Sequence, residues 1–437
     1  MSYEKLSDPQ LQELAHRLIP GGCHTYAKGD DQFPEDAPGF MVRGKGCHVW
    51  DRSGKEYIEY AMGLRAVTLG HCFDPVDDAV IAQIRKGLNF NRPSVIEVEA
   101  AEELLSLVPR AEQVKFAKDG STVLTAAIKL ARAHTGRVKI AVCADHPFFS
   151  YNDWFMVSTG IPGGIPESRR QETLSFRFND LASAEKLFAE HPGEICAVLL
   201  EGERTVAPKD GFLHKLRELA HRHGALFILD EMVTGLRWHN GGAQAVYDVE
   251  PDLSTWGKAL ANGYPLSALA GKREIMDQGG LYHDKERVFL LSTTHGAESS
   301  ALAAALAVIK YYKEHDVPSV LHRQGERLRR GILKTVGELK LQDHFTIDGR
   351  DCSLFYGTRD QEKKPSQPFR TLFLQQSLRR GLLAPSFIMS YSHSDADIDR
   401  TIEIVSESLL VYRDALQNGV EKYLHGRSIK PVYRRFN

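Results

Sequence analysis

The most informative stretch of the chain is Ile228-Leu229-Asp230-Glu231-Met232-Val233-Thr234-Gly235. It starts as an apolar run of strand type, continues into two carboxylates and turns at a glycine. An α/β enzyme places its ligand-binding groups at the carboxyl ends of its core strands, and Asp230 stands at such an end. Taken alone, the Asp-Glu pair is equally well explained as a helix cap or a structural salt bridge.

Apolar runs of strand length alternate with helical patterns on both sides of this stretch. We predict strands at residues 114–116, 139–143, 196–200 and 225–229, with helices at 122–135 and 213–223. Strands that are apolar throughout, separated by helices, are typical of a mainly parallel sheet buried on both faces.

The two ends of the chain predict a second, smaller α+β domain. A hairpin is expected at residues 46–60, helices at 320–331, 368–380 and 395–416, and a short strand at 353–356. A chain of 437 residues is long enough for two domains. We therefore predict a large domain over residues 61–312 and a small domain built from residues 1–60 and 313–437.

The composition of the chain indicates which partners and which cellular location to expect. Hydrophobic residues make up 42% of the chain and charged residues 26%, and the net charge of −2 gives no reason to expect nucleic acid or an anionic membrane as partner. No run of about 20 apolar residues and no signal sequence is visible, so we expect a soluble, cytoplasmic protein. The six cysteines form no Cys-x-x-Cys pair, which predicts neither a disulfide framework nor a metal site.

Two further stretches contain groups that could carry chemistry. Lys258 follows Gly257 after a mostly uncharged run, and a lysine near apolar surroundings loses proton affinity, as a Schiff-base lysine must. The ordinary alternative is a solvated surface lysine. Gly120-Ser121 opens a predicted helix, whose N-terminal N–H groups suit a phosphate, although a plain Ser N-cap explains the same residues.

In their order and spacing, these three stretches resemble the class III aminotransferases of pyridoxal 5′-phosphate (PLP) fold type I. The chain is most similar to their glutamate-1-semialdehyde aminomutase-like branch, from Pro20-Gly21-Gly22 to residues 392–399. Asp-Glu-x-x-Thr-Gly at 230–235, followed by Gly257-Lys258, is the most specific part. The resemblance implies an aspartate-aminotransferase-like α/β fold, with a large domain around a mainly parallel sheet and a smaller α+β domain.

The resemblance also implies roles for individual residues. Lys258 carries PLP as a Schiff base and later moves the α-proton, while Asp230 pairs with the protonated pyridine nitrogen. Gly120 and Ser121 hold the cofactor phosphate. Phe148 stacks on the ring, with Phe149 and Tyr151 as alternatives and core packing as the ordinary explanation of such aromatics.

Two more roles concern the rim of the cofactor site. Glu201 is expected to line it. Thr294, with Thr293 as the alternative, is expected to reach the cofactor phosphate of a neighbouring subunit, which implies a homodimer with shared active sites. Both threonines are otherwise explained as caps of a helix that begins near Glu298.

The sequence departs from the family pattern at three places. Asp119 stands beside the phosphate loop, and we expect it to point away or to be held by Lys118. Lys28 replaces the arginine that holds a substrate carboxylate in the mutases, and it lacks the bidentate fork of arginine. Arg65 stands where relatives tend to have a small residue, and we predict that it binds a carboxylate or phosphate of another substrate. A surface arginine or a structural ion pair is the alternative.

The function expected from this resemblance is a PLP-dependent aminotransferase. It moves an amino group from a donor, plausibly glutamate, to a ketone or aldehyde acceptor through a pyridoxamine phosphate intermediate. Alternatives are an intramolecular aminomutase of the glutamate-1-semialdehyde type, a racemase or decarboxylase on the same scaffold, and a non-catalytic PLP-binding protein. Its partners are small molecules and a second copy of the chain.

Overall fold

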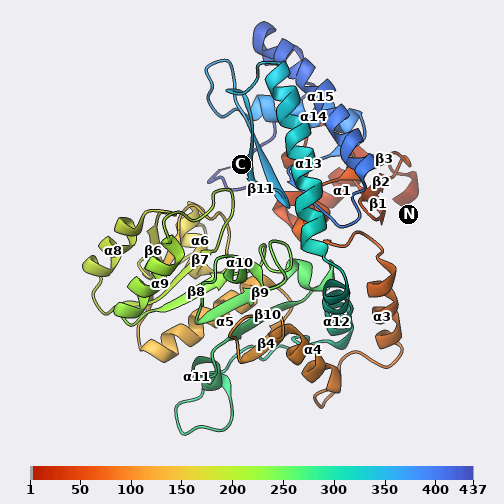
Figure 1. Cartoon of the computed structure of the whole chain (residues 1–437). Helices are drawn as coiled ribbons and strands as arrows, with labels where there is room; N and C mark the ends of the chain where they lie inside the picture. Colours follow the sequence, from red (N-terminus) through yellow and green to blue (C-terminus); the bar gives the residue numbers. More distant parts are fainter. Residues whose placement is uncertain (1–2, 437) are drawn as a thin grey trace. The chain divides into compact units, whose positions relative to one another are not determined.

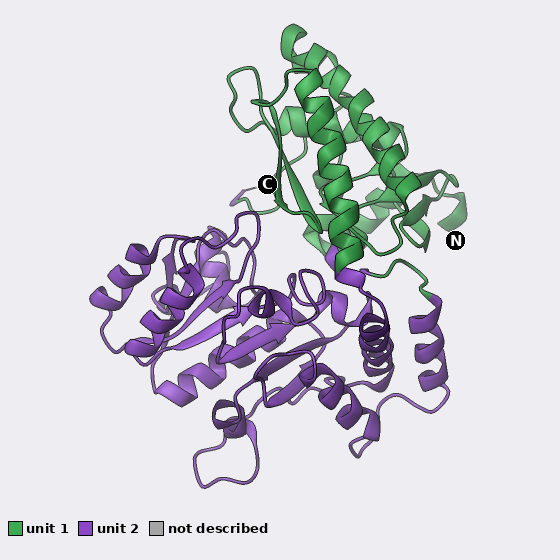
Figure 2. Ribbon diagram, in the orientation of Figure 1, with its two compact units in different colours: residues 1–64, 69–73, 319–434 green, residues 65–68, 74–318, 435–437 purple. Residues whose placement is uncertain are grey.

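A computed structural model describes residues 3–436, and these residues form two compact units. Unit 1 consists of residues 1–64, 69–73 and 319–434, and unit 2 of residues 65–68, 74–318 and 435–437 (Figure 2). No helix in the described part of the chain is long and apolar enough to cross a membrane.

Unit 2 is built on a seven-stranded sheet of order β4-β10-β9-β8-β7-β5-β6 (Figure 1). Strand β10 runs antiparallel to both of its neighbours, while β9, β8, β7, β5 and β6 pair in parallel. The strands are β4 (Gln113–Ala117), β5 (Lys139–Cys143), β6 (Thr173–Phe176), β7 (Ile195–Glu201), β8 (Leu226–Asp230), β9 (Leu253–Trp256) and β10 (Ser267–Gly271). The α/β fold with a mainly parallel central sheet is therefore confirmed.

Helices cover both faces of this sheet. Leu226 and Ile228 of β8 share a core with α5, and the alternate residues Phe227 and Leu229 share another core with α8 and α9. Strands β7 and β8 are apolar up to their final carboxylate because both of their faces are buried. The helices of unit 2 are α3 (Asp74–Ile84), α4 (Val95–Leu105), α5 (Gly120–Thr135), α6 (Asp153–Met156), α7 (Glu167–Arg170), α8 (Leu181–Glu190), α9 (Phe212–Arg222), α10 (Gly242–Val246), α11 (Arg273–Met276) and α12 (Ser299–Glu314).

Unit 1 combines two small sheets with long helices. Strands β1 (Met41–Lys45), β2 (His48–Asp51), β3 (Glu56–Glu59) and β13 (Leu382–Leu383) form one sheet, and β11 (Phe345–Arg350), β12 (Ser353–Thr358) and β14 (Phe387–Ile388) form the other. The predicted hairpin is the antiparallel pair β2–β3. The helices are α1 (Asp8–Leu18), α14 (Gln367–Arg379), α15 (Asp395–Asn418) and α13 (Val317–Glu338), whose first residues belong to unit 2.

The segment Met62–Arg65 (α2) has an unusual backbone. All four residues have positive φ angles, of 43°, 57°, 57° and 76° in chain order. Left-handed backbone costs roughly 1–2 kcal/mol for each non-glycine residue. Strain of this kind persists only where surrounding contacts hold it in place, and it is concentrated at functional sites.

Candidate active site

The three sequence motifs meet at the side chain of Met232. A Cβ atom added to Gly120 would lie 2.8 Å from Met232 Cε, and one added to Gly257 would lie 2.2 Å from the same atom. Met232 packs directly against the backbone of both glycines, so a side chain at either position would require the flexible end of Met232 to move. The start of α5, the turn after β8 and the turn after β9 are brought together at the carboxyl edge of the sheet.

Asp230 is the last residue of β8 and is 3% exposed. Its Oδ1 accepts hydrogen bonds from the Met232 N–H (2.9 Å) and from the hydroxyl of Thr255 on β9 (3.0 Å). Burial and the nearby Glu201 carboxylate raise the pKa of Asp230 to about 7, although Lys258 and these hydrogen bonds act in the opposite direction. The carboxyl group therefore lacks a cation strong enough to keep it ionised.

Lys258 follows β9 and begins a short 3₁₀ turn, with a φ of +46°. Its side chain is partly exposed. Burial lowers the pKa of Lys258, and the cations of Arg65 and Arg204 lower it further, against the opposing effect of Asp230 and Glu201. A lysine with a lowered pKa has a larger fraction of neutral, nucleophilic amine, which Schiff-base chemistry requires.

Glu201 ends β7 and pairs in register with Asp230 on β8. Its Oε1 accepts a hydrogen bond from Arg204 Nη1 (2.8 Å), and its backbone N–H donates to Nδ1 of the buried His146 (3.0 Å). Burial on its own raises the pKa of Glu201, but Arg204, His146 and Lys258 outweigh it and the pKa is lowered. Among the described residues, the buried Oε2 atom of Glu201 has no hydrogen-bond partner.

Arg65 belongs to this group of charges and is half-buried, so it is not a solvated surface residue. Its backbone carbonyl accepts a hydrogen bond from Arg237 Nη2 (3.0 Å), which also donates to the Thr68 hydroxyl (3.0 Å). The fully buried Arg237 thus fixes the carbonyl of Arg65, the last residue of the left-handed segment. Burial, Arg204 and Arg237 lower the pKa of Arg65, against the attraction of Glu201.

The N-terminus of α5 differs in part from expectation. The helix begins at Gly120, and Asp119 is its N-cap: its two carboxyl oxygens accept from the Thr122 N–H (2.9 Å) and hydroxyl (2.8 Å). The expectation that Lys118 holds Asp119 is wrong, because Lys118 pairs with Glu298 (2.9 Å). Gly120 and Ser121 occupy the first two helical positions, whose N–H groups have no acceptor within the helix.

The three candidate aromatic residues, Phe148, Phe149 and Tyr151, lie in different environments. Phe149 is 2% exposed and belongs to the hydrophobic core. Phe148 is 41% exposed and packs edge-on against Phe155 at a centroid distance of 5.8 Å. The backbone N–H of Tyr151 donates to Ser121 Oγ (3.2 Å), which ties this loop to the start of α5.

Thr293 and Thr294 are both exposed. The helix that follows them is capped by Glu298, whose side chain accepts the Ser300 N–H at 2.6 Å. The alternative that these threonines are helix caps is therefore wrong for the described chain.

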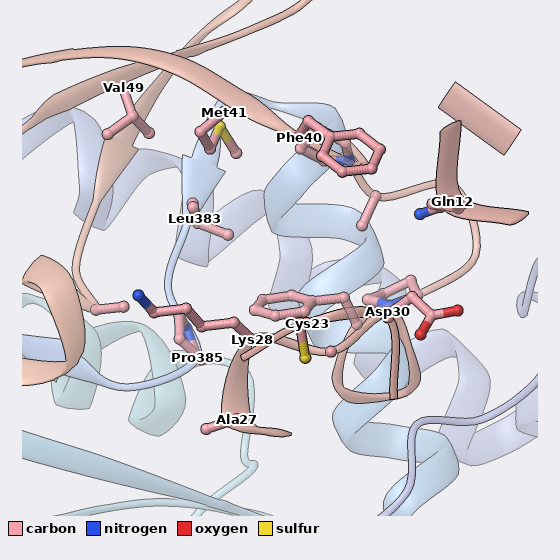
Figure 3. A pocket seen from close by; sticks show the side chains of 18 of the residues that line it. Gln12, Cys23, Ala27, Lys28, Asp30, Phe40, Met41, Val49, Leu383 and Pro385 are labelled. Atoms are coloured by element: carbon pink, nitrogen blue, oxygen red, sulfur yellow. The ribbon is translucent and has the colours of Figure 1, made fainter. Parts of the chain in front are cut away.

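Lys28 belongs to unit 1 and is not one of the residues around Lys258 described above. It lines a cavity of about 670 Å³ whose walls include the apolar side chains of Phe40, Met41 and Leu383. The Lys28 side chain extends into this cavity (Figure 3). Among the described residues, no ion pair or hydrogen bond joins its ammonium group to a neighbour.

Sequence reasoning missed four residues of the site: His146, Arg204, Arg237 and Thr255. Arg204 follows Glu201 by three residues, a spacing that is visible in the sequence. His146, Arg237 and Thr255 act through contacts with residues 25 to 172 positions away, and no local pattern reveals these.

Comparisons with known proteins place the chain in a family. Residues 31–408 match the aminotransferase class-III family. The chain is 32% identical to 3-aminobutyryl-CoA aminotransferase of Cloacimonas acidaminovorans (91% of this chain, 95% of that protein) and 31% identical to glutamate-1-semialdehyde 2,1-aminomutase of Chloroflexus aggregans (90% and 95%). The solved structure of FumI protein from Sphingopyxis sp. MTA144, in its PLP internal aldimine form, superposes with a TM-score of 0.85 at 26% identity (96% of this chain, 98% of that chain). The chain belongs to the class III aminotransferases and is a PLP-dependent enzyme of fold type I.

The predicted family, fold and cofactor are thereby confirmed, and the residues at the carboxyl edge fit PLP. Asp230 is a buried carboxyl group short of a cation, which the protonated pyridine nitrogen would provide. Lys258 has a lowered pKa, and α5 presents free N–H groups of the kind that bind a phosphate.

Proposed function

We propose that this enzyme transfers an amino group from glutamate to a ketone or aldehyde that carries an anionic group, with Lys258 and Asp230 as its catalytic residues. PLP, when bound, supplies an aldehyde that condenses with amines and a ring that withdraws electrons. The observation that carries the proposal is that the pKa values of Lys258 and Asp230 are shifted in opposite directions. The pKa of Lys258 is lowered and that of Asp230 is raised, at one edge of one sheet.

The residues of this chain have distinct tasks in the proposal. The neutral amine of Lys258 binds the cofactor and moves a proton at the substrate α-carbon. Asp230, oriented by the Met232 N–H and the Thr255 hydroxyl, holds the proton on the pyridine nitrogen. Gly120 and Ser121 would bind the cofactor phosphate through their N–H groups, and Phe148 would pack against the ring. Glu201 would line the site, and it orients Arg204.

Arg65 is proposed as the group that binds the anion of the acceptor. Around Lys258 and Arg65, the cations of Arg65, Arg204 and Arg237 outnumber the carboxyl groups of Glu201 and Asp230. The excess of positive charge favours an anionic substrate. Lys28, which extends into the apolar cavity of unit 1, is proposed as a second contact to the substrate.

We also infer that the active form is a homodimer located in the cytoplasm. Large apolar side chains of α3, α4 and their connection are exposed, as expected of a surface covered by a second copy: Ile81, Ile84, Leu88, Phe90, Val95 and Val98. The exposed Thr294 is then available to the cofactor phosphate of the neighbouring subunit. All six cysteines are free thiols, which supports a reducing compartment.

The test is the absorbance spectrum of the protein purified with PLP, recorded before and after addition of glutamate. We expect a visible band that glutamate bleaches and that is absent in Lys258→Ala. The variant Lys186→Ala, which changes an exposed lysine of α8, serves as the matched control and should behave like the wild type. A band that persists in Lys258→Ala would contradict the assignment of Lys258.

An intramolecular aminomutase remains the second candidate, because a relative of 31% identity bears that name. The two reactions differ in their need for a second substrate. A transaminase produces 2-oxoglutarate from glutamate in an amount equal to the enzyme until an acceptor is added. A mutase converts a single amino compound without any release of 2-oxoglutarate.

A further inference from the structure

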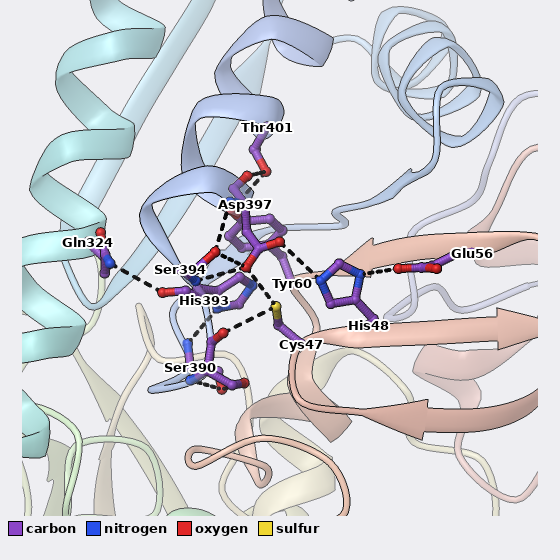
Figure 4. A network of polar contacts seen from close by, with 11 residues as sticks. Cys47, His48, Glu56, Tyr60, Gln324, Ser390, His393, Ser394, Asp397 and Thr401 are labelled. Carbon is purple, nitrogen blue, oxygen red and sulfur yellow. Dashed lines mark hydrogen bonds and ion pairs between the residues drawn. The ribbon is translucent and has the colours of Figure 1, made fainter.

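Three side chains of the kinds that bind metal ions meet in unit 1. Cys47 directly precedes β2, His48 is the first residue of that strand, and Asp397 lies in the first turn of α15. Their Sγ, ring nitrogen and carboxyl oxygen atoms all lie within 4.8 Å of one another. Figure 4 shows the three side chains pointing toward a common point.

The distances between these atoms suit a metal centre. His48 Nε2 is 3.0 Å from Asp397 Oδ1, and Cys47 Sγ is 3.6 Å from Asp397 Oδ2. Ligands that surround Zn²⁺ tetrahedrally at 2.0–2.3 Å are roughly 3.4 Å apart. The His48 and Cys47 atoms face different oxygens of Asp397, so the carboxylate would have to rotate for one oxygen to bind the metal beside both. A thiolate, an imidazole and a carboxylate are also a donor set that Zn²⁺ accepts.

We propose that Cys47, His48 and Asp397 bind one divalent transition-metal ion, Zn²⁺ by preference, with a fourth coordination position open to water. The site joins β2 to α15, two elements about 350 residues apart in the sequence. It was not expected from the sequence, because no Cys-x-x-Cys or His-x-x-His spacing marks it.

The groups behind the ligands support this assignment. His48 Nδ1 lies at ion-pair distance (2.7 Å) from Glu56 Oε1 on β3, while Nε2 faces Asp397. Asp397 Oδ2 accepts hydrogen bonds from the Ser394 N–H (2.8 Å) and hydroxyl (2.6 Å). Metal-binding histidines and carboxylates are typically oriented by such outer contacts, and removal of one weakens metal affinity about 10–100-fold.

Cys47 is 1% exposed, and its thiol lies within hydrogen-bond distance of the Ser392 carbonyl (3.5 Å) and of Asp397 Oδ2 (3.6 Å). When the metal binds, the Cys47 sulfur–hydrogen bond is replaced by a sulfur–metal bond, and the proton leaves to solvent. His48 likewise binds through its neutral form and releases any proton on Nε2. No electron is transferred, so the step needs no oxidant or reductant.

Without a metal ion, the same atoms form a hydrogen-bonded network that fastens the N-terminus of α15 to β2. The two interpretations make different predictions for metal content, for thermal stability in the presence of zinc and for the effect of Glu56. The experiment therefore measures metal binding by the intact holoenzyme and does not depend on transamination.

Tag-free holoenzyme is stripped with a chelator, dialysed against Zn²⁺ and assayed for zinc by elemental analysis. We expect one zinc ion per chain in the wild type, and a rise in Tm on zinc addition. Cys47→Ser should lose the bound zinc and the rise in Tm, while it keeps the Lys258-dependent absorbance band that reports a folded enzyme. The control Cys72→Ser, which changes an exposed thiol, should bind zinc like the wild type.

Glu56→Gln provides a second variant that leaves all three ligands in place. It should weaken zinc binding about 10–100-fold in the same dialysis. Substoichiometric zinc in the wild type would overturn the proposal. Equal zinc binding in wild type and Cys47→Ser would do so as well, because the metal would then be held elsewhere.

Discussion

Asp230 and Asp252 lie at opposite edges of the same sheet and have opposite electrostatic character. Asp230 ends β8 at the carboxyl edge, and its pKa is raised to about 7. Asp252 precedes β9 at the amino edge and is also buried, but its pKa is lowered to about 2. Burial raises the pKa of both groups, so the difference comes from their partners.

Asp252 has three good partners: His221 Nε2 (2.8 Å), Lys272 Nζ (2.9 Å) and the Phe227 N–H (2.8 Å). Asp230 has two hydrogen bonds on one oxygen and a second carboxylate, Glu201, beside it. A fully paired carboxylate stabilises the fold, whereas an incompletely paired one stores electrostatic free energy that a cationic ligand can release. The amino edge is therefore structural, and the carboxyl edge is prepared for a ligand.

The largest expected effect is on catalysis. Asp230→Asn removes the anion opposite the pyridine nitrogen, and we expect the glutamate half-reaction to slow by roughly 10²–10³-fold. Stopped-flow absorbance of the PLP-loaded protein measures this rate. Asp252→Asn is the matched control, since it changes the same residue type in the same sheet, and its rate per folded molecule should be close to that of wild type.

The second largest effect is on the stability of the fold and is expected for Asp252. Asp252→Asn should lower the free energy of unfolding by roughly 2 kcal/mol at pH 7, because three partners lose a buried anion. The folded pKa of about 2 lies below the usual 3.8, so this stabilisation is present above pH 3.8 and is lost as pH falls toward 2. Urea unfolding at pH 7 and pH 3 should show a smaller difference from wild type at pH 3.

In the PLP-free protein, the stabilising contribution of Asp230 should change with pH in the direction opposite to that of Asp252. With a folded pKa of about 7, Asp230 keeps its proton in the folded state while the unfolded chain loses it from pH 3.8 upward. Its contribution to stability therefore declines as pH rises from about 4 to 7. Thermal unfolding of PLP-free Asp230→Asn should lack this decline. In Glu201→Gln the charge beside Asp230 is removed, so the decline in stability should end at a lower pH than in the wild type. A decline over the same pH range would argue against an effect of Glu201 on the pKa of Asp230.

The smallest effect concerns substrate selection at the carboxyl edge. Arg65→Ala should raise the KM for a 2-oxo acid acceptor about 10-fold or more, and the KM for glutamate far less. An uncharged aldehyde acceptor should be affected little. Arg222→Ala, on the exposed side of α9, is the control. Equal changes for donor and acceptor would count against Arg65 as the acceptor's anion contact.

The sequence predicted the elements of the sheet well, because their apolar runs and glycine turns are local signals. The expected strand 139–143 coincides with β5, and the expected helix 368–380 lies one residue from α14. The start of α5 was placed two residues late, because Asp119 and not Ser121 caps the helix. The helix expected at 320–331 is only the middle of α13, which starts at Val317-Pro318 and continues past Gly331 to Glu338. The predicted domain boundaries stay a prediction.

The candidate site was predictable only where a residue lies inside a motif. Asp230, Lys258 and Gly120 come from such motifs, and the structure brings them together through Met232. Arg237 was not predicted, although it holds the backbone of Arg65 across 172 residues. Contacts of this kind depend on how the chain folds back on itself, and a single sequence contains no local record of them.

The position of Met232 has a consequence for the evolution of this enzyme. Its methyl group fills the space that a side chain at either 120 or 257 would need, so the three positions form one steric unit. A larger residue at 257 requires the Met232 side chain to move or to become smaller, so the effect of each change depends on the residue present at the other position. Substitutions at these sites will therefore be strongly non-additive, and libraries that vary them one at a time will miss the viable combinations.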